Sequence, residues 1–243
     1  MNNSNTTDIF FCKEFQVIQE VNKMKVNTDA MLLGAWSSVK GKNSIIDIGT
    51  GTGIIALMLA QRNPVARILG IEIEQGSASE AKRNFEGSVW SENLDIQCQS
   101  IQEFSRESNE KYDLLVSNPP FFTGGTLSLN ENKNNVKHTT RLSHGDLLIS
   151  VSRLMKKGGH FDVILPYIEG ERFIELARRY NLFPERITEV RSRVSTSIER
   201  LLISFTDRIF EVERETLIMF KEGVDRDPTD QYRDLLGSFY LKY

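Results

Sequence analysis

Residues 116–125 of the chain, VSNPPFFTGG, place an amide and two aromatic rings directly after an apolar run. Consecutive prolines cannot continue a strand or a helix, because each proline fixes φ and lacks an N–H donor. The residue before each proline is also held in an extended conformation. The stretch therefore predicts a stiff turn that presents Asn118 and Phe121 in one fixed shape. The alternative is a plain strand-ending turn with Phe121 and Phe122 in the core.

Residues 45–57, IIDIGTGTGIIAL, indicate a buried strand, a glycine turn and a helix. Gly49, Gly51 and Gly53 let the backbone turn tightly and let a ligand approach it closely. The third glycine comes one residue too early for a dinucleotide-binding G-x-G-x-x-G pattern, which disfavours a nicotinamide dehydrogenase. Asp47 would repel a phosphate but suits a cation such as an α-amino group. A capping or turn role is the other interpretation of Asp47.

The next predicted strand ends LGIEIE and places Glu72 where a ribose-binding acid belongs. A surface strand end is the alternative interpretation of Glu72. Asp47 and Glu72 lie at the carboxyl ends of neighbouring strands. Together they favour a nucleoside ligand that carries an amino acid and no phosphate, and S-adenosylmethionine fits that description.

The elements that position these residues alternate along the chain from residue 44. Apolar runs predict strands at 44–48, 67–73, 94–99, 112–117 and 159–165. Helical patterns lie at 53–61, 76–85, 102–107, 147–155 and 171–180. This alternation predicts an α/β fold with a parallel sheet covered by helices on both faces. After residue 181 we expect an antiparallel strand pair at 187–193 and 197–207, a further strand at 211–220 and a helix at 228–241.

Composition describes an ordinary soluble globular protein of 243 residues, with 40% apolar and 26% charged residues. No apolar run is long enough to cross a membrane, and the first residues lack the pattern of a secretion signal. Two cysteines and three scattered histidines indicate no disulfide framework and no metal site, so we expect a cytoplasmic protein without metal. The net charge of −3 gives no global signal for nucleic-acid binding.

Three stretches of the chain carry a resemblance to a known family. They are FQVIQEVNKMKVNTDAMLLGAW, which is the most specific, IIDIGTGTGII and SNPPFF. The sequence resembles class I S-adenosylmethionine-dependent methyltransferases, and specifically the bacterial tRNA1(Val) (adenine-37-N6)-methyltransferase family. The resemblance runs from about residue 10 to about residue 240. It implies a Rossmann-like, mostly parallel seven-stranded sheet with an antiparallel closing strand. Residues 1–43 would form a segment covering the cofactor site, and residues 44–243 the methyltransferase domain.

The resemblance also implies roles for the proline motif. The Asn118 side-chain oxygen and the Pro119 carbonyl would accept hydrogen bonds from the N6 amine of adenine, and Phe121 would stack on the flipped base. Pro119 and Pro120 would fix both acceptors before the substrate arrives. The product would be N6-methyladenosine.

Further cofactor residues follow from the same resemblance. Lys25, Thr28 and Asp29 would cover the methionine part, although Thr28 is also a plausible helix N-cap. Ser100 stands where many relatives carry an Asp that binds the cofactor's adenine. A serine brings no charge, and its alternative role is to cap the helix that follows.

The expected partner is the anticodon loop of a tRNA, with no membrane partner and a monomeric chain. The candidate RNA contacts are Lys133, Lys137, His138 and Arg141. N6 methylation of another RNA and N5 methylation of a protein glutamine are the alternative activities. The second reaction belongs to enzymes with a sizeable helical domain before the cofactor domain. A non-catalytic cofactor- or RNA-binding module is a third interpretation, disfavoured by the intact Asn118 and Asp47.

Overall fold

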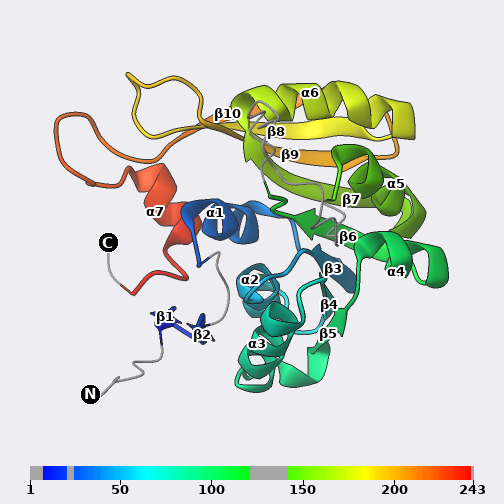
Figure 1. Ribbon diagram of the computed structural model, residues 1–243. Helices are drawn as coiled ribbons and strands as arrows, with labels where there is room; N and C mark the ends of the chain where they lie inside the picture. The colour runs from blue at the N-terminus through cyan, green and yellow to red at the C-terminus, as the bar shows by residue number, and fades with distance from the viewer. Residues whose placement is uncertain (1–7, 21–24, 121–141, 242–243) are drawn as a thin grey trace, which may run out of the picture.

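The computed structural model describes residues 8–20, 25–120 and 142–241 (Figure 1). Its strands are β1 (Ile9–Phe11), β2 (Gln16–Ile18), β3 (Ser44–Ile48), β4 (Arg67–Glu72), β5 (Leu94–Cys98), β6 (Tyr112–Ser117), β7 (Met155–Pro166), β8 (Phe183–Arg191), β9 (Arg200–Thr206) and β10 (Glu213–Ile218). Its α-helices are α1 (Thr28–Trp36), α2 (Ile54–Arg62), α3 (Gln75–Glu86), α4 (Ile101–Glu107), α5 (His144–Leu154), α6 (Tyr167–Ala177) and α7 (Asp230–Leu236). The alternation predicted for residues 44–180 is confirmed.

One central sheet has the strand order β10-β8-β9-β7-β6-β3-β4-β5. The neighbouring pairs β5–β4, β4–β3, β3–β6 and β6–β7 are parallel, whereas β9 runs antiparallel to both β7 and β8. The predicted antiparallel pair is therefore confirmed. The sheet has eight strands instead of seven, because β10 adds itself parallel to β8 at the outer edge.

Helices cover both faces of this sheet, as the alternation of strands and helices requires (Figure 1). Side chains of α1, α2, α3 and α7 join one hydrophobic core, and those of α4, α5 and α6 join the other. Within β3, Ile45 belongs to the first core, whereas Ile46 and Ile48 belong to the second. Since side chains alternate along a strand, Asp47 faces the same side as α1 and α2.

The N-terminal part forms a small antiparallel sheet of β1 and β2, which the sequence patterns did not predict. Asn84 of α3 ties this hairpin to the loop after β3. Its side-chain oxygen accepts from the Ile18 N–H at 2.8 Å, and its amide group donates to the Ile18 and Thr52 carbonyls at 2.9 Å each. The hairpin is thus connected to the glycine loop through one buried side chain.

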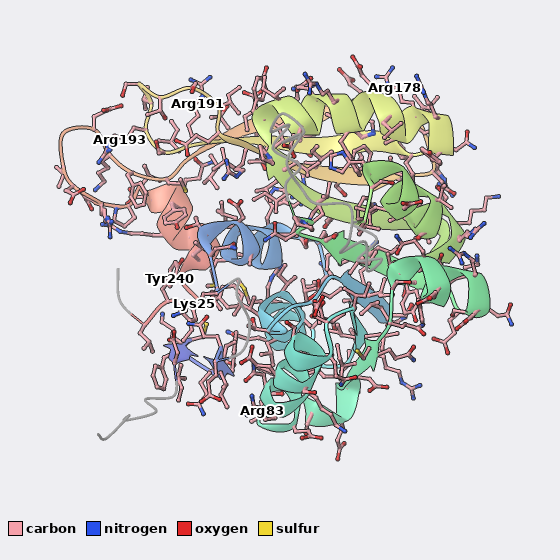
Figure 2. All side chains as sticks on the ribbon, viewed as in Figure 1. Lys25, Arg83, Arg178, Arg191, Arg193 and Tyr240 are labelled. Carbon is pink, nitrogen blue, oxygen red and sulfur yellow. The ribbon has the colours of Figure 1, made fainter. Side chains whose placement is uncertain are left out.

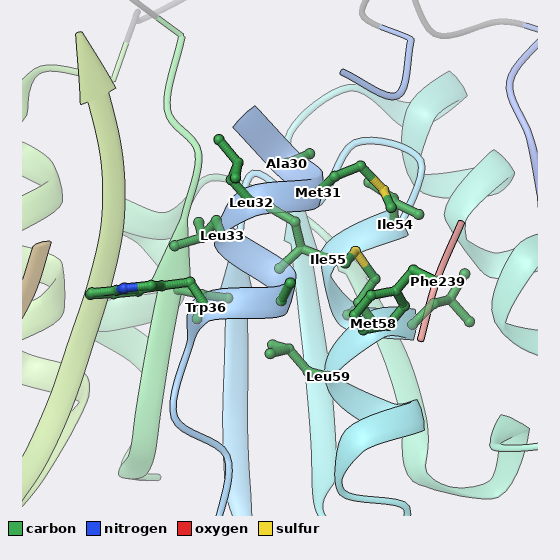
Figure 3. Close-up of a cluster of buried hydrophobic side chains, with 14 of the residues drawn as sticks. Ala30, Met31, Leu32, Leu33, Trp36, Ile54, Ile55, Met58, Leu59 and Phe239 are labelled. Carbon is green, nitrogen blue, oxygen red and sulfur yellow. The ribbon is translucent and has the colours of Figure 1, made fainter. Parts of the chain in front are cut away.

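Helix α1 packs on α2 with an almost fully apolar surface (Figure 3). Its residues 30–36 are all buried, and Gly34 lies so close to Met58 that a Cβ there would come within 2.7 Å of the Met58 sulfur. Figure 3 also shows the Trp36 ring pointing away from α2.

Within the residues that the structure describes, no helix is both long and apolar enough to cross a membrane.

Candidate functional site

Three predicted residues meet at the carboxyl ends of β3, β4 and β6. Ile48, the last residue of β3, is in register with Ile71 of β4 and with Ser117 of β6. The residues that follow these positions are Gly49, Glu72 and Asn118. The Ser117 hydroxyl also donates to the Ile48 carbonyl at 2.9 Å, which pins the end of β6 to β3. Sheet register therefore brings together groups that come from three separate stretches of sequence.

The loop after β3 has a path that its glycines make possible. Gly49, Gly51 and Gly53 have φ angles of 73°, 56° and 84°, a region that strongly favours glycine. At Gly53, which caps the start of α2, a Cβ would also lie 2.5 Å from a ring carbon of Phe85. Glycine at this position is thus required both by the backbone angle and by the neighbouring side chain.

Glu72 fastens the glycine loop from the end of β4. One carboxylate oxygen accepts from the Gly51 N–H at 3.0 Å, and the other accepts from the Glu74 N–H at 3.0 Å. Each carboxylate oxygen can accept a further hydrogen bond. Glu72 therefore holds the loop and still has acceptor capacity for a ligand.

Two cavities adjoin this meeting point, and Gly49, Glu72 and Asn118 line both of them. The β5-side cavity, of about 260 Å³, is lined by Ile48, Gly49, Ile71, Glu72, Ile73, Gln99, Ser100, Ile101, Gln102, Ser117, Asn118, Pro119, Pro120 and Leu142. The α1-side cavity, of about 240 Å³, is lined by Lys25, Val26, Asn27, Ala30, Gly49, Thr50, Gly51, Thr52, Ile54, Ile55, Glu72, Glu74, Ser77 and Asn118.

Ser100 lines the β5-side cavity and also caps α4. Its hydroxyl accepts from the Glu103 N–H at 3.2 Å, and the Glu103 carboxylate accepts from the Ser100 N–H at 3.4 Å, which completes a capping box. The hydroxyl also donates to the Glu103 carboxylate at 2.8 Å. The expectation of a cap is confirmed, and both the donor and one acceptor position of the hydroxyl are used. Gln99 and Gln102 line the same cavity with amide groups that can both donate and accept.

The residues that begin α1 are arranged differently from the expectation. Asn27, not Thr28, is the N-cap, because Asn27 is extended and its side-chain oxygen accepts from the Ala30 N–H at 2.9 Å. Asn27 and Ala30 line the α1-side cavity together with Lys25, which forms an ion pair with Asp8. Thr28 and Asp29 are absent from the described lining of either cavity.

Asn27 was not predicted from the sequence as the N-cap, although a signal for it was present. Asparagine is among the strongest N-cap residues, and the stretch Asn27–Asp29 offers three good capping residues in a row. Backbone geometry chooses among them. Glu74 and Ser77 of the α1-side cavity and Gln99 and Gln102 of the β5-side cavity carried no comparable pattern.

Asp47 is fully buried beneath the glycine loop and does not belong to the described lining of either cavity. Its carboxylate accepts from the Thr50 hydroxyl at 2.6 Å, so in this structure it supports the loop from below. Burial raises the pKa of the Asp47 carboxyl to about 7, and hydrogen bonds from Thr50 and from the Ala56 N–H offset part of that effect.

This raised pKa predicts a pH dependence of stability. The folded protein holds the Asp47 proton more tightly than the unfolded chain does. The stabilisation that this proton gives to the folded state is therefore complete below the unfolded pKa near 4. It is lost as pH rises through the folded pKa near 7. We expect Asp47→Asn to gain about 1 kcal/mol relative to the parent between pH 6 and pH 7. Urea unfolding of both proteins from pH 5 to pH 8 measures this, and parallel stability curves would contradict it.

The remaining predicted residues divide into two groups. Pro119 is buried, Pro120 is exposed, and both line the β5-side cavity beside Asn118. Phe121, Lys133, Lys137, His138 and Arg141 lie outside the described residues. Within the described ranges, no group of three His, Cys, Asp or Glu side chains could hold a metal ion.

The fold and the site define a class I methyltransferase. A predicted O-methyltransferase from Agrobacterium tumefaciens has a similar fold, with a TM-score of 0.68 and 19% identity over 87% of this chain and 96% of that chain. A T. thermophilus 16S rRNA N2 G1207 methyltransferase, solved with AdoMet and guanosine, has a TM-score of 0.57 and 17% identity over 83% of this chain and 50% of that chain. The family model for the methyltransferase small domain matches residues 23–164.

Curated relatives narrow the class further. A tRNA1(Val) (adenine(37)-N6)-methyltransferase of Christiangramia forsetii is 37% identical over 96% of this chain and 98% of the relative. The Proteus mirabilis protein of the same name is 36% identical over 96% of this chain and 94% of the relative. The chain belongs to the tRNA1(Val) (adenine(37)-N6)-methyltransferase family, as its sequence motifs predicted.

Proposed function

We propose that the chain transfers a methyl group from S-adenosylmethionine to N6 of adenine 37 in tRNA1(Val). The observation that carries this proposal is the position of Asn118. Asn118 lines both cavities at the point where the glycine loop and Glu72 also meet, and two prolines follow it in the chain. The names of the relatives support the particular nucleotide and tRNA.

The residues of the two cavities fit the cofactor. Glu72 has acceptor capacity for the two ribose hydroxyls, and the glycine loop permits close approach of the ligand to the backbone. The α1-side cavity contains carboxylates of Glu72 and Glu74 with Lys25, which is already paired to Asp8. This balance suits a ligand with positive sulfonium and ammonium groups and disfavours one with phosphates.

We assign the adenine of the cofactor to the β5-side cavity and the methionine part to the α1-side cavity. Gln99, Ser100 and Gln102 would face the base, and Lys25 and Asn27 would cover the amino acid. Asp47 would act through the loop that it supports, close to the ammonium group. The segment 1–43 would thus close one side of the cofactor site, and residues 44–243 would provide the rest. When bound, the cofactor supplies an electrophilic methyl group on sulfur.

The chain's own contribution to the reaction is to make a poor nucleophile reactive. The lone pair of the adenine N6 amine is delocalised into the ring. The Asn118 side-chain oxygen and the Pro119 carbonyl would accept the two N6 hydrogens and draw the nitrogen towards tetrahedral geometry. Because the prolines fix these acceptors in advance, they need no reorganisation during the transfer. The proton can leave after the nitrogen becomes cationic.

The RNA side of the proposal depends on an unstacked base. An adenine inside a duplex cannot reach Asn118, whereas a base in an anticodon loop can be extruded. Phe121 would stack on that base, and Lys133, Lys137, His138 and Arg141 would meet nearby phosphates. We also propose that the enzyme is cytoplasmic, monomeric and free of metal.

Three arginines of β8, β9 and the loop between them are already engaged within the protein. Arg186 and Arg200, which a basic patch on β8 and β9 would need, both bind groups of α1. Arg193 donates to the carbonyls of Lys221 and Val224. Figure 2 shows Arg191 and Arg193 together in the region of the β8–β9 loop, with Lys25 beside the N-terminal hairpin. We therefore expect few phosphate contacts and a shallow dependence of tRNA affinity on salt.

Labelled cofactor tests the substrate directly. The protein is incubated with labelled S-adenosylmethionine and, separately, with total tRNA, ribosomal RNA and a protein extract. We expect label only in tRNA, recovered as N6-methyladenosine at position 37 of the valine tRNA. A transcript of that tRNA with guanosine at position 37 is the matched control and should stay unlabelled. Label in ribosomal RNA or on a protein glutamine, with tRNA unlabelled, would overturn the proposed substrate.

A further inference from the structure

Three arginines from distant parts of the chain contact helix α1. Arg62 of α2 donates to the Gly34 and Ser37 carbonyls at 2.9 and 2.6 Å. Arg186 of β8 donates to the Trp36 carbonyl at 3.0 Å, and its guanidinium lies 3.8 Å from the centre of the Trp36 ring. Arg200 of β9 donates to the Asp29 carboxylate at 2.9 Å.

The first two arginines hold the C-terminal end of α1. The last carbonyls of a helix lack partners within the helix and carry partial negative charge, so guanidinium groups are well suited to them. The Trp36 indole N–H also donates to the Thr188 hydroxyl at 2.7 Å. With the buried side chains of Leu32 and Leu33, which Figure 3 labels, these contacts hold the later turns of α1 without Asp29.

The first turn of α1 has a different support. Asn27 and Ala30 line the α1-side cavity, and Asp29 points to Arg200 instead. The Asp29 side chain is 14% exposed and that of Arg200 is 32% exposed, so the pair is largely shielded from water. Arg200 is the first residue of β9 and is in register with Pro166 of β7 and with Val190 of β8. The carboxylate is therefore fastened to an internal strand of the sheet.

We propose that the Asp29–Arg200 ion pair positions the first turn of α1 against the α1-side cavity and thereby sets the affinity for the cofactor. Asp29 was expected to bind the cofactor, and this geometry gives it an indirect role. The inference rests on the proposed function for the identity of the ligand. Without the pair, the first turn keeps the burial of Ala30 and Met31 but loses its tie to β9, whereas the later turns keep their contacts with Arg62 and Arg186.

A double-mutant cycle tests the pair. Asp29→Asn and Arg200→Gln each remove it, and both variants are compared with the combined one. We expect the Kd of S-adenosylhomocysteine, measured by calorimetry, to rise about tenfold in each single variant. The double variant should show the same rise, because the interaction can be lost only once. At saturating S-adenosylmethionine, kcat should stay within about twofold of the parent, since neither side chain touches the reacting atoms.

Hydrogen exchange provides a readout without cofactor or RNA. The Ala30 and Met31 N–H groups donate to the Asn27 side chain and carbonyl. We expect both to exchange faster in the single variants, while the Ser37 N–H, which donates to the Leu33 carbonyl, keeps the parental rate.

Asp113→Asn is the matched control. Asp113 forms an ion pair of 3.0 Å with Lys156 and is 22% exposed, but it lies near the amino end of the central strand β6, away from the carboxyl end that leads to Asn118. This variant should lower the melting temperature and leave the Kd of S-adenosylhomocysteine unchanged. It separates the effect of losing a partly buried charge from the effect of losing the position of the first turn of α1.

The possible outcomes differ clearly. Weaker binding in Asp29→Asn but not in Arg200→Gln would mean that Asp29 contacts the cofactor itself, and the inference would be wrong. A lower melting temperature with unchanged Kd in both variants would reduce the pair to a stabilising contact and would also overturn it. A parent protein that fails to bind S-adenosylhomocysteine would overturn the proposed function, and this inference with it.

Discussion

Replacing Asn118 by alanine is expected to lower kcat about a hundredfold or more while the Kd of S-adenosylhomocysteine changes by less than about threefold. The variant removes one preorganised acceptor for the N6 hydrogens, and loss of a single such group typically costs that much. The backbone carbonyl of Pro119 remains, so residual activity is expected. The glycine loop and Glu72, which we assign to the cofactor, are unchanged in this variant.

Single-turnover kinetics with saturating cofactor and tRNA measure this effect. Asn93→Ala is the matched control, because the Asn93 amide donates to the Pro64 carbonyl outside both cavities. It should keep the parental rate. If Asn118→Ala also methylated tRNA at the parental rate, the proline motif would be only a strand-ending turn.

Replacing Glu72 by alanine is expected to weaken S-adenosylhomocysteine binding about a hundredfold. The change removes the charge-assisted acceptor for the ribose hydroxyls, and it also frees the Gly51 and Glu74 N–H groups that Glu72 now binds. Hydrogen bonds to a charged group contribute about 1.5–3 kcal/mol each, and a hundredfold change in Kd corresponds to about 2.7 kcal/mol. Glu72→Gln keeps the shape without the charge and should give a smaller loss, of about tenfold.

A cofactor analogue distinguishes ribose recognition from support of the loop. S-adenosylhomocysteine without its two ribose hydroxyls should bind more weakly to the parent, and Glu72→Gln should weaken it little further. Glu74→Gln is the control for the ribose hydroxyls: Glu74 lines only the α1-side cavity, so its loss should affect the analogue and the complete ligand equally. Equal losses for the analogue and the complete ligand in Glu72→Gln would show that Glu72 acts through the loop alone.

From residue 44 onward, local patterns were sufficient for the order of elements because each pattern spans only a few residues. The apolar strand ending in Asp47 and Ile48, its glycine loop and the next helix lie where the sequence predicted them. Strand β10 carries four exposed residues in a row, 213–216, so an apolar pattern marks it weakly. Its pairing with β8, which makes the eighth strand, depends on the rest of the sheet.

The sequence alone determined that a glycine loop, an acid and an Asn-Pro-Pro turn end three strands of a parallel sheet, because parallel strands place their carboxyl ends at one edge. It could not determine which side chains reach a ligand there. Asp29 and Arg200 are 171 residues apart, and only the register of β9 beside β7 brings them together. Likewise, Asp47 accepts a hydrogen bond from Thr50 because Asp47 is buried under the loop, and this burial is a property of the packed chain. Partners of buried side chains come from long-range packing, which no local pattern encodes.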